Sequence, residues 1–451
     1  MARRLLLQFE AGVPARDKIQ KDPCMKKLMS LFFILFLTIP SAAKAEEPVR
    51  KGETLDLKRC IAIALQRQPN ILAAQNTVKV NESRIGQAKA NYFPHVNLST
   101  GYSRNYTDAS ASAYGSKSPY NNYSSSVTLS QNIYDFEKTS TQVKIQSLNR
   151  DSSRQDLANV SSKIVFNVKQ SYFALLSAMK NRDVAEETVR QFQQHLDRAK
   201  GFFEVGVKPK FDVTKAEVDL SNARINLLSA ENNVRIARVN LNNAMGLPEA
   251  PDYKIEDSLA FQPYEINFEE ALKKAYENRP DLKSVVLRKE SLEKSIDLAK
   301  KGYYPYLTGS ANYGYDGQDF PLDRGWMVGA TLNFPIFDGL STKYQVDEAR
   351  ANLEVQKANE ESLRQSIHLD VQQAWLNLQV ARDKISAAEL AVRQAAENLD
   401  LANGRYAAGV GSPIEVTDAL VAQSNARTAY VAALYDYKLA GASMEKAMGV
   451  Q

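Results

Sequence analysis

A duplicated pattern limits the folds that this chain of 451 residues can adopt. Residues 55–102 resemble residues 266–313 at an offset of 211 positions, and residues 128–246 resemble residues 331–449 at an offset of 203. Two halves of about 200 residues therefore share one architecture. The expected divisions are a leader at 1–45, a first repeat at 46–246, a linker at 247–265 and a second repeat at 266–451.

Each half contains a long segment in which apolar residues recur every three or four positions, as on one face of a helix. The clearest stripes cover residues 160–179 and 363–378. Proline is absent from residues 136–203 and 339–406, so we expect a helix of about 68 residues, about 100 Å long, over each range. Such a helix belongs to a coiled coil or a tube, and a cytoskeletal-type rod is the alternative.

Before each long helix, apolar and small polar residues alternate with a period of two, which predicts β-hairpins at about 94–134 and 305–336. Each expected strand has roughly the 9–11 residues that cross a bilayer at a tilt, with an apolar outer face and a polar inner face. Ordinary soluble hairpins are the alternative. Aromatic residues gather where strands meet helices, as an interfacial girdle would: Tyr92, Phe93, Tyr134, Tyr303, Tyr304 and Phe337.

Four strands cannot close a barrel, and open sheet edges are not tolerated in lipid. The chain must therefore oligomerise. Two copies give eight strands and three give twelve, and a wide polar lumen favours three because side chains fill an eight-stranded barrel. The expected fold is mainly α with a small transmembrane β part, in which a trimeric 12-stranded β-barrel continues into a long α-helical, coiled-coil barrel.

The excess of basic residues is confined to the start of the chain. The formal net charge is +5, and residues 1–45 hold eight basic and three acidic groups, so the remainder is balanced. This balance argues against nucleic acid as a partner. Residues 25–45 have the basic, apolar and small-residue regions of a secretory signal, which indicates cleavage after Ala45 and makes Met25 a candidate start.

Several segments resemble the TolC family of outer-membrane efflux proteins, over about residues 50–450. The segments are Gln68-Pro69-Asn70, Tyr92-Phe93-Pro94, residues 129–135, Phe203-Glu204-Val205-Gly206-Val207, residues 405–410 and Met448-Gly449. The resemblance implies a homotrimer in the outer membrane of a Gram-negative bacterium. It also implies a tunnel through the periplasm, with the linker around its middle. The tunnel's tip would dock on a periplasmic adaptor (membrane fusion protein) of an inner-membrane pump.

The function that this resemblance implies is the exit duct of a tripartite efflux or type I secretion system, gated at its periplasmic tip. A structural or adhesive surface trimer, or a passive porin, is the alternative. Porins carry far more strands per chain, and adhesins lack two lipid-facing hairpins between helices. The duct is therefore the better interpretation.

No catalytic constellation is found, so we expect no enzyme activity, no cofactor and no metal site. The three histidines, His95, His195 and His368, are far apart and have no His or Cys at metal-ligand spacing, so we expect them to be solvated or lumenal. Gly409-Val410-Gly411 lacks a third glycine and follows a helix, which argues against a nucleotide-binding loop.

Two helical turns are expected where the long helices meet their return helices, at 212–245 and 413–447. Glycine for the reversal and proline after it are typical of such turns. On one interpretation these residues only make the turn. On the other, which the resemblance favours, the tips contact the adaptor through Val205, Gly206, Val207, Gly409 and Val410.

Glu415 and Asp418 are spaced i and i+3, so they share one helix face. If this face lines a pore, three chains bring six carboxylates to its narrowest point, which attracts cations. The alternative is that the acids complement the positive end of a helix. The resemblance matches both residues to the periplasmic gate, where acidic residues constrict the closed tunnel.

Asp212 and Tyr406 also match gate positions of the family, and we expect a hydrogen bond from the Tyr406 hydroxyl to Asp212. One departure concerns Gly411, which stands where a member of the family has an arginine after the second tip. Lys208 and Lys210 are the candidates to replace that arginine, and a less tightly held closed state is the alternative.

Overall fold

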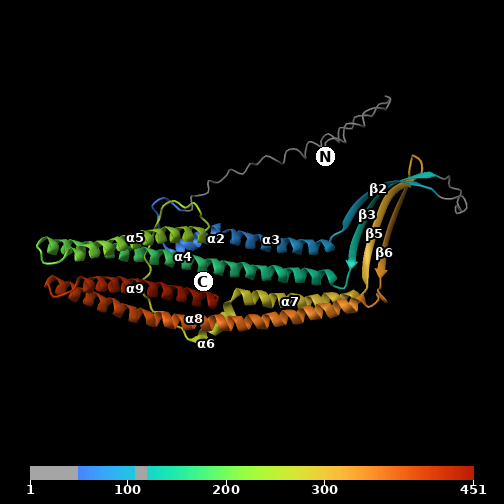
Figure 1. The fold of residues 1–451 in the computed structure, drawn as a ribbon. Coiled ribbons are helices and arrows are strands. Elements are labelled where there is room, and N and C mark those ends of the chain that lie inside the picture. The colour runs from blue at the N-terminus through green and yellow to red at the C-terminus, as the bar shows by residue number, and fades with distance from the viewer. Residues whose placement is uncertain (1–48, 107–118, 451) are drawn as a thin grey trace, which may run out of the picture. The chain divides into compact units, whose positions relative to one another are not determined.

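The computed structural model describes residues 49–106 and 119–450. The predicted leader at 1–45, with its signal at 25–45, lies outside these residues. Within them, the two halves contain helices of the same lengths in the same order, namely 11, 21, 67 and 35 residues. The first set is α2 (Leu57–Arg67), α3 (Pro69–Lys89), α4 (Lys138–Glu204) and α5 (Lys210–Ala244). The second set is α6 (Phe268–Asn278), α7 (Pro280–Lys300), α8 (Ser341–Ala407) and α9 (Pro413–Ala447) (Figure 1).

The long helices begin two residues later than the ranges 136–203 and 339–406 suggested. Phe136 and Glu137 have positive φ angles of 49° and 62°, which lie outside the right-handed helical region. The Asp135 carboxylate accepts a hydrogen bond from the backbone N–H of Thr139 at 2.8 Å, so it caps the first turn of α4. Asp338 caps α8 in the same way. The backbone reverses at these points before each helix starts.

A four-stranded antiparallel sheet lies at one end of the helices (Figure 1). Along the chain, each half contributes one hairpin, which follows the short helices and precedes the long helix. The strands are β2 (His95–Asn105), β3 (Tyr120–Tyr134), β5 (Tyr306–Gly317) and β6 (Asp323–Asn333), in the spatial order β2-β3-β5-β6. The hairpin from the first half therefore pairs with the hairpin from the second through β3 and β5. In the described chain, β2 and β6 are the two unpaired edges.

The register of the strand pairs places most apolar residues of all four strands on one face of the sheet. Leu129 lies opposite Val96 on one side and Ala311 on the other, and Ala311 lies opposite Val328. Directly opposed residues point to the same side of a sheet. This face also holds Leu98, Tyr102, Val127, Tyr313, Trp326 and Leu332. Asn97, Ser126, Thr128, Ser310, Asn312 and Thr331 lie on the opposite face, which is mainly polar.

The apolar face is exposed, as a lipid-facing surface would be in an isolated chain. Leu98 is 71% and Trp326 is 76% exposed. A β-bulge between Asn132 and Tyr134 brings Tyr134 opposite Leu307, so this tyrosine joins the apolar face at its helical end. Among the described residues, no helix combines the length and apolar character needed to cross a membrane.

The helices bury three separate apolar clusters. One surrounds Tyr172 and includes residues of α2, α4 and α5. The second surrounds Ile367 and Val371 of α8, and the third surrounds Tyr406 near the helical turns. The linker packs on the first cluster, because β4 (Lys254–Ile255) pairs in parallel with β1 (Thr54–Leu55) and the Tyr172 hydroxyl donates to the Glu256 carbonyl at 2.7 Å.

Candidate functional site at the helical turns

The two helical turns have the same backbone geometry. After α4, Gly206 adopts φ 74° and the N–H of Val207 donates to the Phe202 carbonyl at 2.9 Å. After α8, Gly409 adopts φ 80° and the N–H of Val410 donates to the Arg405 carbonyl at 3.1 Å. Left-handed backbone favours glycine, so both glycines are needed for the turn itself.

Position 411 requires glycine because the backbone of Arg405 and Tyr406 passes close to it within the second turn. A Cβ atom at this position would lie 2.8 Å from the backbone nitrogen of Tyr406 and 2.9 Å from the carbonyl carbon of Arg405. Any larger residue would push the turn open. This explains the departure at Gly411, because an arginine does not fit this turn as it is folded. Lys208, one of the two proposed replacements, places its Nζ 5.7 Å from the centre of the Tyr406 ring.

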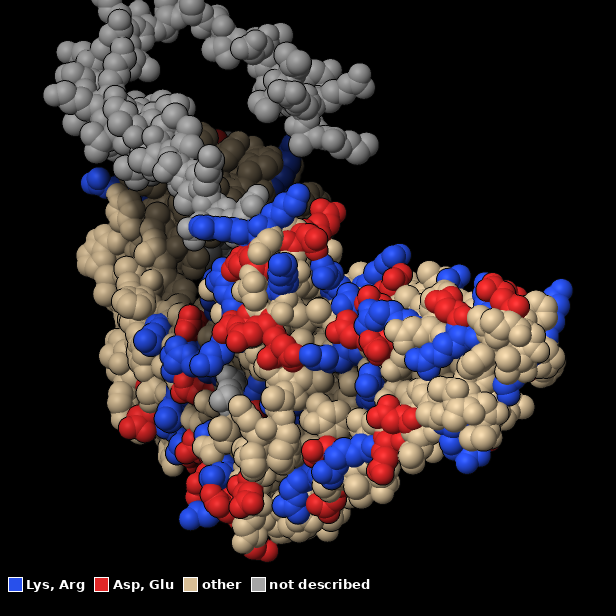
Figure 2. Space-filling model, turned by 90° about the vertical axis from the view of Figure 1, so that its left-hand side faces the viewer, with Lys and Arg blue, Asp and Glu red and all other residues tan. Residues whose placement is uncertain are grey.

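The apolar residues of the tips are directed away from the helices. Val205, Val207 and Val410 are 71%, 60% and 70% exposed. Figure 2 views the end that carries the turns, where basic and acidic side chains are interspersed among uncharged ones. The tips therefore present exposed apolar residues in a surface of mixed charge. Whether they contact an adaptor remains a prediction.

Tyr406 is fully buried among aromatic rings, and it does not make the hydrogen bond to Asp212 that the sequence suggested. Its hydroxyl has no hydrogen-bond partner among the described residues. Its ring centroid lies 5.3 Å from that of His195 and 5.4 Å from that of Phe202. This ring packing, rather than a link to Asp212, fixes the side chain. Burial, and secondarily the Asp212 carboxylate, raise the pKa of Tyr406.

His195 is buried, so the expectation of a solvated or lumenal side chain is wrong for this residue. It lies in the third cluster, and its Nδ1 atom has no hydrogen-bond partner within residues 49–106 and 119–450. Burial lowers its pKa, as Arg198 and Lys215 also do, while Asp219 and Asp212 act against the shift. Its spacing from buried Phe192, Leu196 and Ala199 was the signal in the sequence, because all lie on one helix face.

Glu415 makes two interactions, a helix cap and an ion pair with Arg405. Of these two interactions, the sequence suggested only the first, in which Glu415 supports the helix start. It is the third residue of α9 and forms a capping box with Ser412, whose hydroxyl accepts from the N–H of Ile414 at 3.2 Å. Its Oε2 atom also accepts from Nε of Arg405 at 3.1 Å. The interpretation that this acid supports the helix start is therefore correct for Glu415. Part of its charge is offset by Arg405.

Asp418 is exposed one turn further along α9, and no ion pair or hydrogen bond of its side chain is found in the described part of the chain. Asp212 differs again, because it is buried in the first turn of α5, where a carboxylate complements the positive helix end. Glu415 and Asp418, the two acids of the predicted pore face, thus have different surroundings.

A buried polar link that the sequence analysis missed connects α5 with α9 near the turns. The Asp219 carboxylate accepts from Lys215 Nζ at 2.5 Å and from the Thr417 hydroxyl at 3.1 Å. Further along, Gln191 donates to Gln423 at 3.1 Å. Because the partners are nearly 200 positions apart, local spacing held no signal for this pairing. The link ties the first helical pair to the second.

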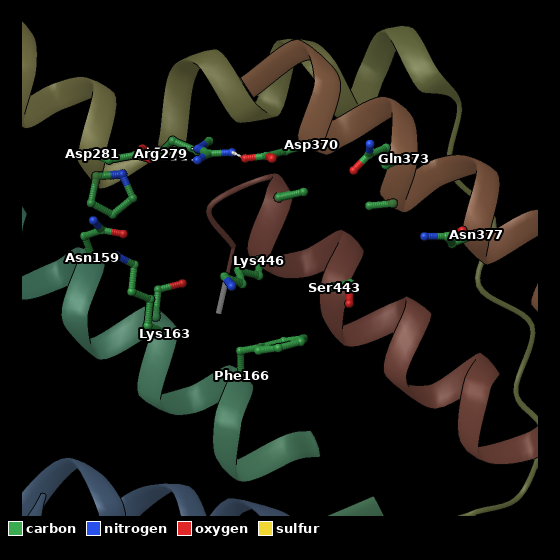
Figure 3. Close-up of a pocket in the computed structure, with 14 residues that line it drawn as sticks. Asn159, Lys163, Phe166, Arg279, Asp281, Asp370, Gln373, Asn377, Ser443 and Lys446 are labelled. Atoms are coloured by element: carbon green, nitrogen blue, oxygen red, sulfur yellow. Dashed lines mark hydrogen bonds and ion pairs between the residues drawn. The ribbon is translucent and has the colours of Figure 1, made fainter. Parts of the chain in front are cut away.

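A separate polar hollow of about 440 Å³ lies where α4, α7, α8 and α9 meet (Figure 3). Arg279 turns toward Asp281 at 2.7 Å and Asp370 at 2.8 Å, and Lys446 lies over the Phe166 ring. These contacts join α7 to α8 and α9 to α4. Among the described residues, no group of three or more His, Cys, Asp or Glu is arranged to hold a metal ion.

A family described as outer membrane efflux protein matches residues 60–247 and 271–450. The chain belongs to this family. As a family member it is an outer-membrane efflux or secretion channel of a Gram-negative bacterium and not an enzyme.

This efflux-family protein is similar to known proteins in sequence and in fold. Outer membrane protein TolC of Escherichia coli (strain K12) is 25% identical over 389 residues, covering 81% of this chain and 76% of TolC. Protein CyaE of Bordetella pertussis is 25% identical over 427 residues, covering 93% of this chain and 87% of CyaE. The crystal structure of the Campylobacter jejuni CmeC outer membrane channel is similar with a TM-score of 0.76 at 19% identity, covering 87% of this chain and 85% of CmeC.

Proposed function

We propose that this protein is the exit duct of a tripartite efflux or type I secretion system. Three chains would form a 12-stranded barrel in the outer membrane, continued by an α-helical barrel through the periplasm. A periplasmic adaptor and an inner-membrane pump would complete the system. The two repeats would each contribute one β-hairpin and one pair of long helices.

The exposed apolar face of the sheet is the observation that carries this proposal. It extends over all four strands, and the sheet ends in two unpaired edges, β2 and β6. Unpaired backbone groups are not tolerated in lipid, so the edges must pair with other copies. A closed ring of three copies satisfies both edges and leaves room for a lumen.

The long helices support the same assembly, because two of them carry an exposed apolar stripe. On α5 the stripe consists of Val218, Ile225, Leu228, Ile236 and Val239. On α8 it consists of Val355, Leu369, Leu376, Val380, Leu390 and Leu401. The spacings keep each set on one side of its helix. Neighbouring chains in the helical barrel would bury these stripes.

For the gate, we propose that Asp418 provides the main charge of the pore constriction, with Glu415 beside it. Arg405 offsets Glu415, whereas no partner of Asp418 is found in the described chain. Asp212 and Tyr406 would support the closed tip through burial and packing. Val205, Gly206, Val207, Gly409 and Val410 would form the adaptor contact, with the valines providing apolar surface.

The assembly can be tested by adding a charge to the α5 stripe. Leu228→Asp should convert the detergent-solubilised trimer to monomers, because it places a carboxylate in the proposed interface. Asn226→Asp adds the same group at an exposed position on another side of α5 and should stay trimeric. Sedimentation gives the number of chains. A wild-type monomer, or a Leu228→Asp variant that stays trimeric, would contradict the assembly.

The duct can be tested in cells and in bilayers. Deletion should sensitise the bacterium to dyes or detergents, or abolish secretion of a protein, and the purified trimer should conduct ions across a planar bilayer. A deletion strain with neither defect would instead support a structural or adhesive surface trimer. A large, ungated conductance would support a passive porin.

A further inference from the structure

A hollow of about 450 Å³ lies where the start of α4 meets the end of α7. It is lined by Glu137, which precedes α4, and by Ser140, Thr141 and Lys144 of α4, which share one side of the helix start. From α7 and the turn that follows, it is lined by Lys294, Asp297, Lys300, Lys301 and Tyr304. The hollow is therefore lined by residues from both halves of one chain.

Four lysines and two acidic residues give the hollow an excess of positive charge. Lys301 is 13% exposed, and its Nζ donates to the Phe136 carbonyl at 3.0 Å and to Glu137 at 3.2 Å. Lys294 lies 3.5 Å from Asp297. Lys144 and Lys300 are exposed, and within the described residues their ammonium groups make no ion pair or hydrogen bond. Two cations are thus available to a ligand.

A chain of aromatic rings connects this hollow to the apolar face of the sheet. Tyr134 lies on that face, opposite Leu307. The Phe136 ring centroid is 4.7 Å from that of Tyr134 and 5.7 Å from that of Tyr304, on which it stacks. Tyr304 lines the hollow. The lysines therefore lie just beyond the helical end of the apolar face.

A second hollow, of about 720 Å³, lies at the same junction on the other side of the sheet. Among its lining residues, Asn132 lies opposite Thr308 and Tyr306 lies opposite Asn333, so both belong to the polar face. The two sides of the junction are thus distinct. The polar face leads to the larger hollow, and the apolar face leads to the lysines.

We infer that the lysine hollow binds the phosphate headgroup of a membrane phospholipid, with a preference for an anionic lipid such as phosphatidylglycerol. This inference rests on the proposed function, which places the apolar face in lipid. Aromatic rings lie at headgroup depth and lysines just outside it. The acyl chains would lie on the apolar face and the phosphate between Lys144 and Lys300. The Ser140 and Thr141 hydroxyls also line the hollow, but both donate to the Glu137 carbonyl, at 3.0 and 2.8 Å, so the lysines supply the charge for the phosphate.

Two exposed lysines outside the hollow provide a control. Lys89 is the last residue of α3, and Lys343 lies in the first turn of α8, where its Nζ is 3.9 Å from Asp347. At the offsets of the repeat, Lys300 corresponds to Lys89, whereas Lys144 corresponds to Asp347 and Lys301 to Ala90. Lys89→Ala/Lys343→Ala therefore removes as much charge from these two helix ends as Lys144→Ala/Lys300→Ala removes from the hollow. Both double variants change exposed side chains and should fold.

Native mass spectrometry of the intact detergent-solubilised protein, titrated with phosphatidylglycerol or phosphatidylethanolamine, tests the inference. The wild type should bind phosphatidylglycerol more tightly, one lipid per chain. Lys144→Ala/Lys300→Ala should bind it about 20-fold more weakly, while the control pair should bind as the wild type does. Equal binding of the two lipids, or equal loss in both variants, would overturn the inference. Displacement of the lipid by inorganic phosphate would identify a free-phosphate site and overturn the lipid assignment.

Conductance of the same preparation separates the two proposals. A preparation that conducts but shows no lipid preference refutes only the lipid site. A preparation that binds the lipid yet forms no conducting assembly refutes the duct and leaves the site standing.

Discussion

Arg405 and Glu415 form an ion pair across the second helical turn, with Nε of Arg405 3.1 Å from Oε2 of Glu415. The same glutamate closes the capping box of α9. Asp418, on the same helix face, has no partner within the described residues. Two carboxylates that are equivalent in the sequence pattern are therefore unequal in their surroundings, and the difference can be measured.

Asp418→Asn should reduce the cation preference of the channel more than Glu415→Gln does, because only Asp418 presents an uncompensated charge. Glu415→Gln should instead cost about 1 kcal/mol of stability in the tip, by weakening the cap and the pair with Arg405. The reversal potential across a salt gradient measures the first effect, and thermal unfolding measures the second. Unchanged selectivity in the Glu415→Gln/Asp418→Asn double variant would refute the gate assignment.

Tyr406→Phe should leave the stability of the tip unchanged or raise it slightly, because the hydroxyl that it removes is buried without a partner. Tyr406→Ala should cost about 3–5 kcal/mol, since it deletes a buried ring that packs on His195 and Phe202. Thermal unfolding compares the two variants. A clear loss of stability in Tyr406→Phe, or an increased conductance, would show that the bond to Asp212 forms in the assembled protein.

Acidification should destabilise the packing around His195. Burial lowers the pKa of this histidine in the folded protein, so the unfolded chain takes up the proton first as the pH falls below about 6.5. Stability should therefore decrease from about pH 7 toward pH 5, and the slope should be smaller in His195→Gln. Amide hydrogen exchange at the C-terminal ends of α4 and α8, followed as a function of pH, measures this loss of stability. The exposed His368→Gln is the control, and equal slopes in the two variants would contradict the prediction.

Gly411→Ala should distort the second turn, because its Cβ would lie 2.8 Å from the Tyr406 backbone nitrogen. We expect a loss of about 1–3 kcal/mol. Gly404→Ala is the matched control, since a Cβ there meets no atom within 4 Å and alanine is the better helix former by about 1 kcal/mol. Thermal unfolding should separate the two. Similar behaviour of both variants would mean that the turn relaxes freely.

The sequence predicted the start of α9 from the proline that follows the glycine of the turn. The helix spans Pro413–Ala447, as expected. The start of α4 was placed too early because the left-handed backbone of Phe136 and Glu137 follows from the sheet-to-helix junction. The local signal for the later start is Asp135, which caps the first turn of α4.

The sequence by itself determined the duplication, through the similarity of segments 211 and 203 positions apart. It also determined the long helices and the two-faced strands, because their periodic patterns depend on residues close together in the chain. The tertiary structure decided which side chains meet. It placed His195 against Tyr406, left the Tyr406 hydroxyl without Asp212, paired Asp219 with Thr417, and brought lysines of α4 and α7 into one hollow. These contacts join residues far apart in sequence, so they depend on how whole helices pack, and spacing along one helix cannot specify that.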